Sequence, residues 1–415
     1  MKGKHTLRIW SKVAPTPKTG LVILAYLAFI ALGMPDGLLG VAWPSMRADF
    51  SIPLDALGML LFAAVSGYMT SSFLSGVLIG RMGVGNLLAA SCALTGSALL
   101  GYTLVPAWWM LVLLGVGAGL GAGAIDAGLN TYVAAHFGEG LMQWLHASYG
   151  IGVTLGPALM TVALTTLGSW RAGYHAVGAF QLAMGACFAL TLPVWGRKEA
   201  PAGSDGPRRL TDYRTPLGET LRQPRAWSSA LLFFLYVGVE VSLGTWIYSL
   251  LTESRGIDPA AAGLWVSSYW ATFTVGRVLA GLYATRAGLD RMVQGGLAGA
   301  ALSAALLAWN PSGATNPLAV ACIGFAIAPI FASLMSGTSR RVGAQDAANT
   351  IGMQMAASSL GAAAVPAMIG VLARRFSLEI FPVTLVGLIL VLWVCYRLSR
   401  GAPAPRQHAQ GGQHV

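Results

Sequence analysis

The sequence predicts an all-α membrane protein in which twelve transmembrane helices form two pseudo-symmetric six-helix bundles. Two observations lead to this fold class: most of the chain consists of apolar runs of membrane-spanning length, and a short motif recurs in the two halves. Of the 415 residues, 55% are hydrophobic and only 10% are charged, with a mean hydropathy of +0.64. A single soluble core could not bury that much apolar surface, so we expect a multi-pass protein of the lipid bilayer.

The apolar runs place the expected spans. A transmembrane helix needs about 20 mostly apolar residues, and charged, proline and glycine breaks divide the chain into twelve such runs. We expect spans at 19–43, 54–80, 84–104, 106–135, 141–167, 171–195, 227–251, 260–285, 291–310, 316–338, 346–373 and 379–398. The longest polar segment lies between the sixth and the seventh. The expected parts are therefore an N-terminal six-helix bundle over 1–195, a cytoplasmic linker over 196–226, a C-terminal six-helix bundle over 227–398 and a cytoplasmic tail over 399–415.

Basic residues gather on one side of the expected spans. If the N-terminus is cytoplasmic, 20 of the 26 Lys and Arg residues fall in cytoplasmic segments, five fall on the opposite side, and Arg277 lies inside a span. This asymmetry follows the positive-inside rule, so we expect a protein of the cell (inner) membrane with both termini in the cytoplasm. The net charge of +11 then reflects topology and contact with anionic lipid headgroups, and it gives no reason to expect a nucleic-acid partner.

A motif at the end of the second span recurs at the end of the eighth. The stretches SGVLIGRMG and AGLYATRAG share a glycine, an arginine and a second glycine at a constant offset of 205 residues. The matched positions are Gly76, Arg81 and Gly83 in the first copy and Gly281, Arg286 and Gly288 in the second. Two parallel halves related by an axis along the membrane normal are typical of transporters, in which the substrate site lies between the halves near mid-bilayer.

The first copy resembles the loop 2–3 signature of the major facilitator superfamily, a glycine frame followed by an acidic residue, a basic residue and glycine. It departs from that signature because Gly80 stands where the family usually has Asp, and Gly85 and Asn86 replace a trailing basic pair. Arg81 is retained, and we expect it to act in gating. The resemblance covers nearly the whole chain and implies the major facilitator fold with alternating access.

Four longer stretches are similar to the fucose permease branch of the sugar:proton symporters. They are GMPDGLLGVAWPSM, GAGAIDAGLNTYVAAHFGEGLMQWLHASYGIGVTLGP, FLYVGVEVSLGTW and WATFTVGRVLAG. The second stretch, across the fourth and fifth spans, is the most specific of the four. This resemblance implies transport coupled to proton entry, with hexose-like sugars as the best-known substrates, and it leaves the substrate itself open.

Three carboxylates, Asp36, Asp126 and Glu240, lie inside expected spans. Each costs about 2.5–3.5 kcal/mol at a helix centre, so we expect each to face a cavity or a partner. A carboxylate that is alternately exposed and occluded can load and release a proton, and we predict that all three take part in proton coupling. Structural alternatives stay open: Asp36 can cap a helix weakened by its GMPDG motif, and Asp126 can lock two helices together through a hydrogen bond.

Charged partners are available to two of these carboxylates. Glu240 and Arg277 lie at similar depth on neighbouring spans, and a paired charge is much cheaper to bury than a lone one. We predict a salt bridge that breaks and forms during transport; if the bridge is permanent, Glu240 is not available for coupling. His146 lies within reach of Asp126 and is predicted to act as a relay or gate, with a place at the membrane interface as the alternative.

Amide and aromatic side chains at suitable depth are the candidates for substrate binding, because amides pair with sugar hydroxyls and aromatic faces cover the apolar side of a sugar ring. They are Asn130, Gln354, Trp246, Tyr269 and Trp270. Asn130 follows Asp126 by four residues, so the two share one helix face. Each aromatic residue can instead anchor its helix in the lipid headgroup region.

The sequence therefore predicts a proton-coupled secondary transporter that imports a small polar solute, with a hexose-type sugar as the leading candidate. A proton-antiporting exporter of drugs or amphipathic metabolites and a non-transporting sensor on the same scaffold are the alternatives, and sodium coupling stays open. The sequence has no Walker motif, so we expect an ion gradient to drive transport, with no cofactor and no enzymatic activity. The four cysteines fall in different spans, so we expect neither a disulfide framework nor a metal site, and we expect a monomer.

Overall fold

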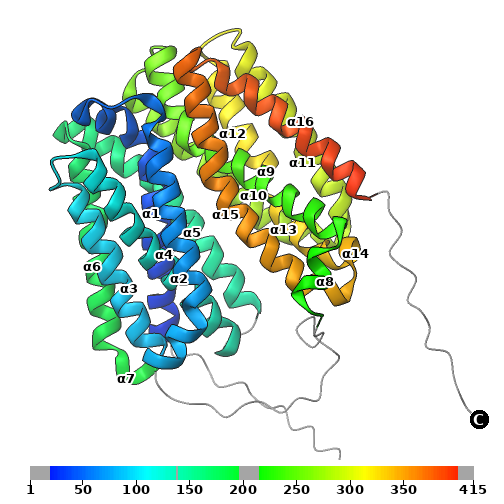
Figure 1. Cartoon of the computed structure of the whole chain (residues 1–415). Coiled ribbons are helices and arrows are strands. Elements are labelled where there is room, and N and C mark those ends of the chain that lie inside the picture. Colours follow the sequence, from blue (N-terminus) through cyan, green and yellow to red (C-terminus); the bar gives the residue numbers. More distant parts are fainter. Residues whose placement is uncertain (1–18, 137–138, 196–214, 401–415) are drawn as a thin grey trace, which may run out of the picture.

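The computed structural model describes residues 19–136, 139–195 and 215–400, and every regular element in these ranges is helical. Figure 1 shows two helical bundles side by side. The expected N-terminal lead, most of the expected linker and nearly all of the expected tail lie outside the described residues. We call the end of the molecule where α7 finishes and α8 begins the linker end, and the opposite end the far end.

The first bundle contains six long helices. Its elements are α1 (Thr19–Phe50), η1 (Leu54–Ala56), α2 (Leu57–Met82), α3 (Val84–Tyr102), α4 (Trp108–His136), α5 (Glu139–Leu167), α6 (Trp170–Leu190) and α7 (Leu192–Trp195). The second bundle contains α8 (Leu217–Leu221), α9 (Pro224–Ser249), the π-helical turn η3 (Leu250–Ser254), α10 (Pro259–Ala287), α11 (Leu289–Trp309), α12 (Thr315–Ile327), α13 (Ile330–Ser336), α14 (Thr338–Val342), α15 (Ala344–Arg375) and α16 (Ile380–Arg400).

The helices correspond to the twelve expected spans, with two local differences. The expected span at 316–338 is interrupted after α12, where Pro329 precedes α13; proline lacks the backbone N–H that a continuous helix would use. The expected linker also contains a short helix, α8, which packs on the start of α15. Its Thr220 hydroxyl donates to the buried Asp346 carboxylate at 2.8 Å, and the Gln223 amide donates to the same carboxylate at 3.2 Å.

Eleven spans among the described residues are long and apolar enough to cross a membrane, with α12 and α13 together forming one of them. The remaining expected span, at 260–285, corresponds to α10, which has 29 residues but is not among these eleven. Its polar residues include Ser267, Ser268, Thr272, Thr274 and Arg277. Because α10 packs against α5 of the first bundle and α12 of its own, protein surrounds much of this polar surface.

The repeated motif occupies equivalent turns in the two halves. Gly83 separates α2 from α3, and Gly288 separates α10 from α11; both have a φ of 78°. That conformation is in the left-handed region, which favours glycine over residues with a side chain. The 205-residue repeat in the sequence is therefore also a repeat in the backbone.

Helix α1 remains helical along its whole length, although its GMPDG motif is expected to weaken it. The glycines of that motif do not break the helix; they leave room for a neighbouring helix to pack closely against it. A Cβ atom on Gly33 would lie 2.4 Å from the Tyr149 carbonyl oxygen, and one on Gly37 would lie 2.4 Å from that of Val153. The two glycines let α1 and α5 approach closely. Asp36, which lies between Gly33 and Gly37 in the sequence, is therefore beside α5.

The two bundles contact each other closely at the far end. Two ion pairs join them there: Arg47 of α1 with Glu253 of η3, and Arg374 of α15 with Asp55 of η1, the latter at 3.0 Å. Backbones also meet directly, since a Cβ atom on Gly40 would lie 2.1 Å from the Gly244 carbonyl oxygen. In Figure 1 the bundles diverge from this end toward the linker end.

Candidate functional site

The first part of the candidate site is a carboxylate–tyrosine pair between α1 and α5. The Tyr149 hydroxyl donates a hydrogen bond of 2.5 Å to Asp36 Oδ2. Asp36 is exposed although it lies near the middle of a 32-residue membrane-spanning helix. Because it is exposed, this carboxylate can exchange protons with water.

A second carboxylate–tyrosine pair joins α2 and α4. The Tyr68 hydroxyl donates to Asp126 Oδ2 at 2.5 Å, and the Asn130 amide donates to Asp126 Oδ1 at 2.9 Å. Glycine brings the helices together, because a Cβ atom on Gly123 would lie 2.3 Å from the Tyr68 carbonyl oxygen. Asp126 is half-buried, and its charge interacts with that of Asp36. The sequence-predicted pair Asp126 and Asn130 thus forms one hydrogen-bonded unit on α4.

His146 lies beside these two pairs. It comes from α5, three residues before Tyr149, and is exposed. Its ring meets the Phe29 ring edge-on, with centroids 5.8 Å apart. Its charge interacts with Asp126 in the first bundle and with Arg277 in the second. No hydrogen bond links His146 to Asp126 among the described residues, so the contact between them is electrostatic.

The second bundle contributes an ion pair at the same level. Glu240 of α9 and Arg277 of α10 lie 3.5 Å apart, measured from Oε1 to Nη2, and their side chains are 14% and 36% exposed. Arg277 also lies over the Phe273 ring, 4.2 Å from its centroid. Tyr236 of α9 interacts with both members of the pair. The other carboxylate oxygen of Glu240 is buried without a hydrogen-bond partner, so this ion pair is incompletely satisfied.

The polar groups of the two bundles interact across the interface. Tyr149 in the first bundle lies within electrostatic range of both Glu240 and Arg277 in the second. We call the combined set the central polar cluster. Its members are Asp36, Tyr68, Asp126, Asn130, His146, Tyr149, Tyr236, Glu240 and Arg277. It brings together all the sequence-predicted coupling residues and Asn130.

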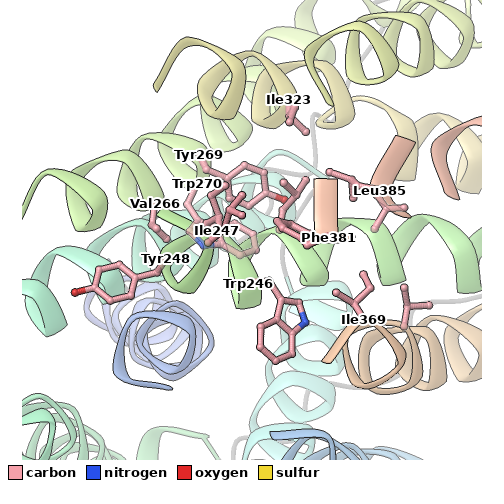
Figure 2. Packing of buried hydrophobic residues seen from close by; sticks show 14 of the residues in the cluster. Trp246, Ile247, Tyr248, Val266, Tyr269, Trp270, Ile323, Ile369, Phe381 and Leu385 are labelled. Carbon is pink, nitrogen blue, oxygen red and sulfur yellow. The ribbon is translucent and has the colours of Figure 1, made fainter. Parts of the chain in front are cut away.

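The three aromatic candidates lie deeper in the protein than expected. Figure 2 shows Tyr269 and Trp270 side by side in the apolar cluster of the second bundle, while the Trp246 indole extends toward the helix that carries Ile369. Trp246 is 0% exposed and donates to the Pro366 carbonyl at 2.9 Å. Tyr269 is also fully buried, and its hydroxyl donates to the Glu240 carbonyl at 2.9 Å. Tyr269 therefore supports the backbone beneath the ion pair, while Trp246 packs within its own bundle.

Trp270 differs from the other two aromatic residues. It is 7% exposed, and its indole Nε1 is buried and has no hydrogen-bond partner within the part of the chain that the structure describes. The ring lies against Gly244, where a Cβ atom would be 2.5 Å from ring carbon Cζ2. An unpaired indole N–H beside the inter-bundle contact is a donor that a ligand or a change in packing can satisfy.

Two further candidates lie away from the cluster. Gln354 is fully buried near the linker end, where its amide donates to Ser229 at 2.7 Å and to Thr338 at 3.0 Å. These bonds satisfy Gln354 within the second bundle in this conformation. Arg81 is exposed at the end of α2 and makes no ion pair with any described residue.

Three functional candidates, Tyr68, Tyr149 and Tyr236, are absent from the sequence-predicted set. Each places a hydroxyl beside one of the three acids that lie inside membrane spans. Two of them could have been found from their spacing in the sequence. Tyr149 follows His146 by three residues, and Tyr236 precedes Glu240 by four. Each therefore shares a helix face with a residue that the sequence predicts for the site. Tyr68 has no such neighbour and could be found only from the packing of α2 on α4.

The cluster is suited to proton transfer and to binding hydroxyl groups. Its carboxylates accept hydrogen bonds, its tyrosines and Asn130 donate them, and its Arg and His carry or share positive charge. Among the described residues, no three His, Cys, Asp or Glu side chains come together in a way that could hold a metal ion.

Comparison with known proteins gives the family context of this geometry. The sequence model of the Major Facilitator Superfamily matches residues 25–366 and, in a second match, 247–414. The sodium-dependent glucose transporter 1A of Mus musculus is 26% identical over 395 residues, which cover 85% of this chain and 89% of that protein. The glucose/mannose transporter GlcP of Bacillus subtilis is 19% identical over 274 residues, 64% of this chain and 67% of that protein.

A solved structure of the nucleoside transporter NupG has the same fold. It superposes with a TM-score of 0.72 at 16% sequence identity and covers 92% of this chain and 99% of that one. At this level of identity the similarity establishes the arrangement of the helices and not the substrate. The two-bundle architecture described above is therefore shared with a transporter that is named for nucleosides and not for sugars.

Proposed function

We propose that this protein, a transporter that belongs to the Major Facilitator Superfamily, imports a small polar solute of the hexose-sugar class together with protons. Membership of the superfamily makes the chain a multi-pass membrane transporter and not an enzyme. The identity of the solute and of the coupling ion is the part that we propose.

The observation that carries the proposal is the pair of carboxylate–tyrosine contacts in the first bundle. Asp36 with Tyr149 and Asp126 with Tyr68 place two proton acceptors beside hydroxyl donors within electrostatic range of each other. Two interacting carboxylates titrate as a pair, and a solute or a conformational change that alters their separation alters how many protons they hold. Such a pair supports coupling of solute binding to proton binding.

The ion pair of the second bundle completes the proposed cycle. Glu240 and Arg277 are 3.5 Å apart, and Arg277 also interacts with Tyr149 and His146 across the interface. Protonation of Asp36 and Asp126 removes negative charge from the first bundle, beside the groups that Arg277 faces across the interface. Proton binding is thereby proposed to favour one arrangement of the bundles over the other.

Sugar recognition is assigned to the hydrogen-bonding side chains of the cluster. A hexose presents hydroxyl groups that donate to carboxylates and accept from Asn130 and the tyrosines. The unpaired Trp270 indole N–H is a further donor near this region. Two relatives of this chain are named as glucose transporters, which supports a hexose over the nucleoside carried by the structural relative.

The orientation of the protein is assigned from its charge. The described members of the basic set that is predicted to be cytoplasmic, such as Arg81, Arg286 and Arg340, lie at the linker end, and we propose that this end faces the cytoplasm at the cell (inner) membrane. The bundles are held together by the far-end ion pairs, and Asp36 and His146 are exposed. In this orientation the conformation is open to the cytoplasm, the state that releases an imported solute.

The coupling ion has one specific competitor. The mouse relative is named as a sodium-dependent transporter, and carboxylates also bind sodium. The tyrosine partners of Asp36 and Asp126 favour the proton, because each tyrosine hydroxyl already donates to a carboxylate oxygen that a sodium ion would need as a ligand.

The proposal is tested by uptake into proteoliposomes. Labelled D-glucose and uridine are each offered with an inward proton gradient, with an inward sodium gradient, or with neither. We expect D-glucose to accumulate under the proton gradient alone. Accumulation of uridine alone would replace the sugar by a nucleoside, and accumulation under sodium alone would replace the proton. Expulsion of cationic dyes without uptake of either solute would support the exporter instead.

Variants connect the result to the site. Asp36→Asn and Asp126→Asn are each expected to abolish accumulation against a gradient, because the amide cannot bind the coupled proton. Asp258→Asn is the matched control, since Asp258 is an exposed acid at the start of α10, about 28 Å along that helix from Arg277. Equal loss in all three variants would indicate a general defect in folding or reconstitution.

A further inference from the structure

A separate pocket lies at the linker end of the second bundle. Its volume is about 210 Å³, and it is bounded by the start of α11, by α13 and α14, and by the last turns of α16. Three arginines, Arg340, Arg341 and Arg400, and one carboxylate, Asp290, line it. None of these side chains belongs to the central polar cluster, so the proposed transport function leaves the pocket unexplained.

The single carboxylate of the pocket is already fully engaged. Arg400 Nη2 lies 2.7 Å from Asp290 Oδ2, the Tyr396 hydroxyl donates to Oδ1 at 2.9 Å, and the Gln294 amide donates to Oδ2 at 2.9 Å. Asp290 offsets one of the three arginines, which leaves the lining with a formal charge of +2. An anion is the complementary ligand.

Hydrogen bonds fix two of the three guanidinium nitrogens of Arg341, and the third lies beside Gly337 in the pocket lining. Its Nη2 donates to the Leu334 carbonyl at 2.5 Å and to Thr338 at 3.3 Å, while Nε donates to Ser229 at 3.3 Å. Nη1 makes no hydrogen bond among the described residues and lies beside Gly337, where a Cβ atom would be 2.8 Å away. Burial lowers the pKa of Arg341 to about 10, so the side chain still carries its charge at neutral pH.

Two further features of the pocket favour an anion. Arg340 is exposed and forms neither a hydrogen bond nor an ion pair with any described residue, so its guanidinium is available to a ligand. The pocket also contains the first residues of α11, whose N-cap residue Gly288 provides no side chain to accept from the free backbone N–H groups. The positive end of this 21-residue helix therefore adds to the charge of the arginines.

The surroundings of the pocket indicate where the anion comes from. Before its last turn, which carries Arg397 and Arg400, the exposed face of α16 is apolar: Leu390, Val391 and Val394 are 47%, 49% and 58% exposed. On a membrane-spanning helix such a face contacts acyl chains. The arginines therefore lie where this apolar surface ends, at the depth of the lipid headgroups.

We propose that this pocket binds the phosphate group of an anionic phospholipid, with Arg340 and Arg341 as the donors and the α16 face as the surface for the acyl chains. Guanidinium groups bind phosphate through paired, charge-assisted hydrogen bonds. Asp290, Tyr396 and Arg400 form the wall that sets the pocket's shape. The inference requires only that the helices span a membrane, and it does not depend on the transported solute.

The test measures binding to the purified full chain in neutral detergent by microscale thermophoresis. The probes are dioctanoyl-phosphatidylglycerol, the zwitterionic dioctanoyl-phosphatidylcholine, and glycerol 1-phosphate, which has the phosphate without acyl chains. We expect phosphatidylglycerol to bind most tightly. Arg340→Gln breaks no described contact, and it is expected to weaken that binding by about tenfold, as is typical of losing one charge-assisted pair.

Two double variants distinguish the effect of removing charge from the pocket from the effect of removing charge elsewhere on the surface. Arg340→Gln with Arg400→Gln removes two charges from the lining, while Arg286→Gln with Arg291→Gln removes two from exposed positions at the same end of the bundle that make no described contact with the pocket. The first pair is expected to lose phosphatidylglycerol binding and the second to keep it. Equal weakening by both pairs, or no weakening by Arg340→Gln, would overturn the site. Binding of glycerol 1-phosphate as tight as that of phosphatidylglycerol would overturn the lipid as the source of the phosphate.

Discussion

At the scale of single residues, the site is organised by carboxylates that each have a tyrosine neighbour. Asp36 and Asp126 each accept a 2.5 Å hydrogen bond from a tyrosine hydroxyl. Hydrogen bonds to charged groups contribute about 1.5–3 kcal/mol, more than bonds between neutral groups. The tyrosines are therefore expected to control how readily each carboxylate exchanges its proton, and not only to fill space.

Replacing one hydroxyl tests this view. Tyr149→Phe removes the bond to Asp36 and keeps the ring, so we expect proton-driven uptake to fall by about tenfold or more while the protein still folds. The control is Tyr102→Phe, because Tyr102 is a buried tyrosine of the same bundle whose hydroxyl forms no hydrogen bond among the described residues. Initial uptake rates in proteoliposomes measure the difference, and equal rates for the two variants would contradict it.

Another residue-scale prediction concerns stability at the far end. Arg255, whose side chain is 4% exposed, donates to Glu379 through Nε at 3.0 Å and Nη2 at 2.7 Å. These bonds hold the pKa of the Glu379 carboxyl below its ordinary value of 4.5. A carboxyl with a lowered pKa stabilises the fold above its unfolded-state pKa, and this contribution disappears as pH falls through the folded-state value.

Glu379→Gln is therefore expected to lower the melting temperature at pH 7, and the difference from the wild type should vanish as the pH falls below 4.5. Glu379 is 43% exposed, so solvent screening limits the loss to about 1 kcal/mol or less. Thermal unfolding in detergent across this pH range measures it. Glu219→Gln, at an exposed acid without an ion pair among the described residues, should show no such pH-dependent difference.

At the scale of helices, glycine determines which elements can approach. At Gly33 and Gly37, the backbone of α5 packs closely against α1. At Gly40, α9 of the second bundle packs closely against the same helix. These residues are spaced so that α1 contacts both bundles along its far half. Small residues permit this contact because they leave room for the neighbouring backbone.

Gly40→Ala places a methyl group 2.1 Å from the Gly244 carbonyl oxygen, a distance that requires the backbones to separate. We expect a destabilisation of about 1–3 kcal/mol, typical of overpacking. Gly387→Ala on α16 is the control, since nothing lies within 4 Å of the added methyl group. Melting temperatures of the two variants measure the effect, and a Gly40→Ala protein as stable as Gly387→Ala would show that the α1–α9 contact is not close in solution.

At the scale of the whole molecule, two six-helix bundles meet at the far end and enclose a polar cluster between them. The fold could be predicted from sequence because membrane spans have a strong length and hydropathy signal and because the 205-residue repeat marks the two halves. The break at Pro329 and the docking of α8 on α15 were not predicted. Both depend on tertiary contacts that hydropathy does not encode.

The candidate site could be predicted only in part. Asp36, Asp126 and Glu240 were identifiable because a carboxylate inside a span is costly, and the structure brings them into one cluster. Their roles in coupling stay predictions. The burial of Trp246 and Gln354 was not predictable, because composition and depth do not reveal which way a helix face points. Tyr68 was missed for the same reason.

The far-end ion pairs are predicted to hold the present conformation. Removing both, by Glu253→Gln with Asp55→Asn, leaves Arg47 and Arg374 unpaired, so we expect the far ends of the bundles to separate. Spin labels at the exposed positions Leu104 and Ser312, in a background lacking the four cysteines, report this distance by electron resonance. A distance distribution shifted to longer values is expected. An unchanged distribution would show that packing alone closes the far end.

The central claim is that sugar movement carries protons through Asp36 and Asp126, and its most direct test is sugar-evoked proton movement. D-glucose is added to unbuffered proteoliposomes that contain the wild type, Asp36→Asn, Asp126→Asn or Asp258→Asn, and the external pH is recorded. We expect the external solution to become more alkaline with the wild type and with Asp258→Asn. We expect no change in external pH with Asp36→Asn or Asp126→Asn. Glucose uptake without any pH change in the wild type, or alkalinisation that persists in both cluster variants, would contradict it.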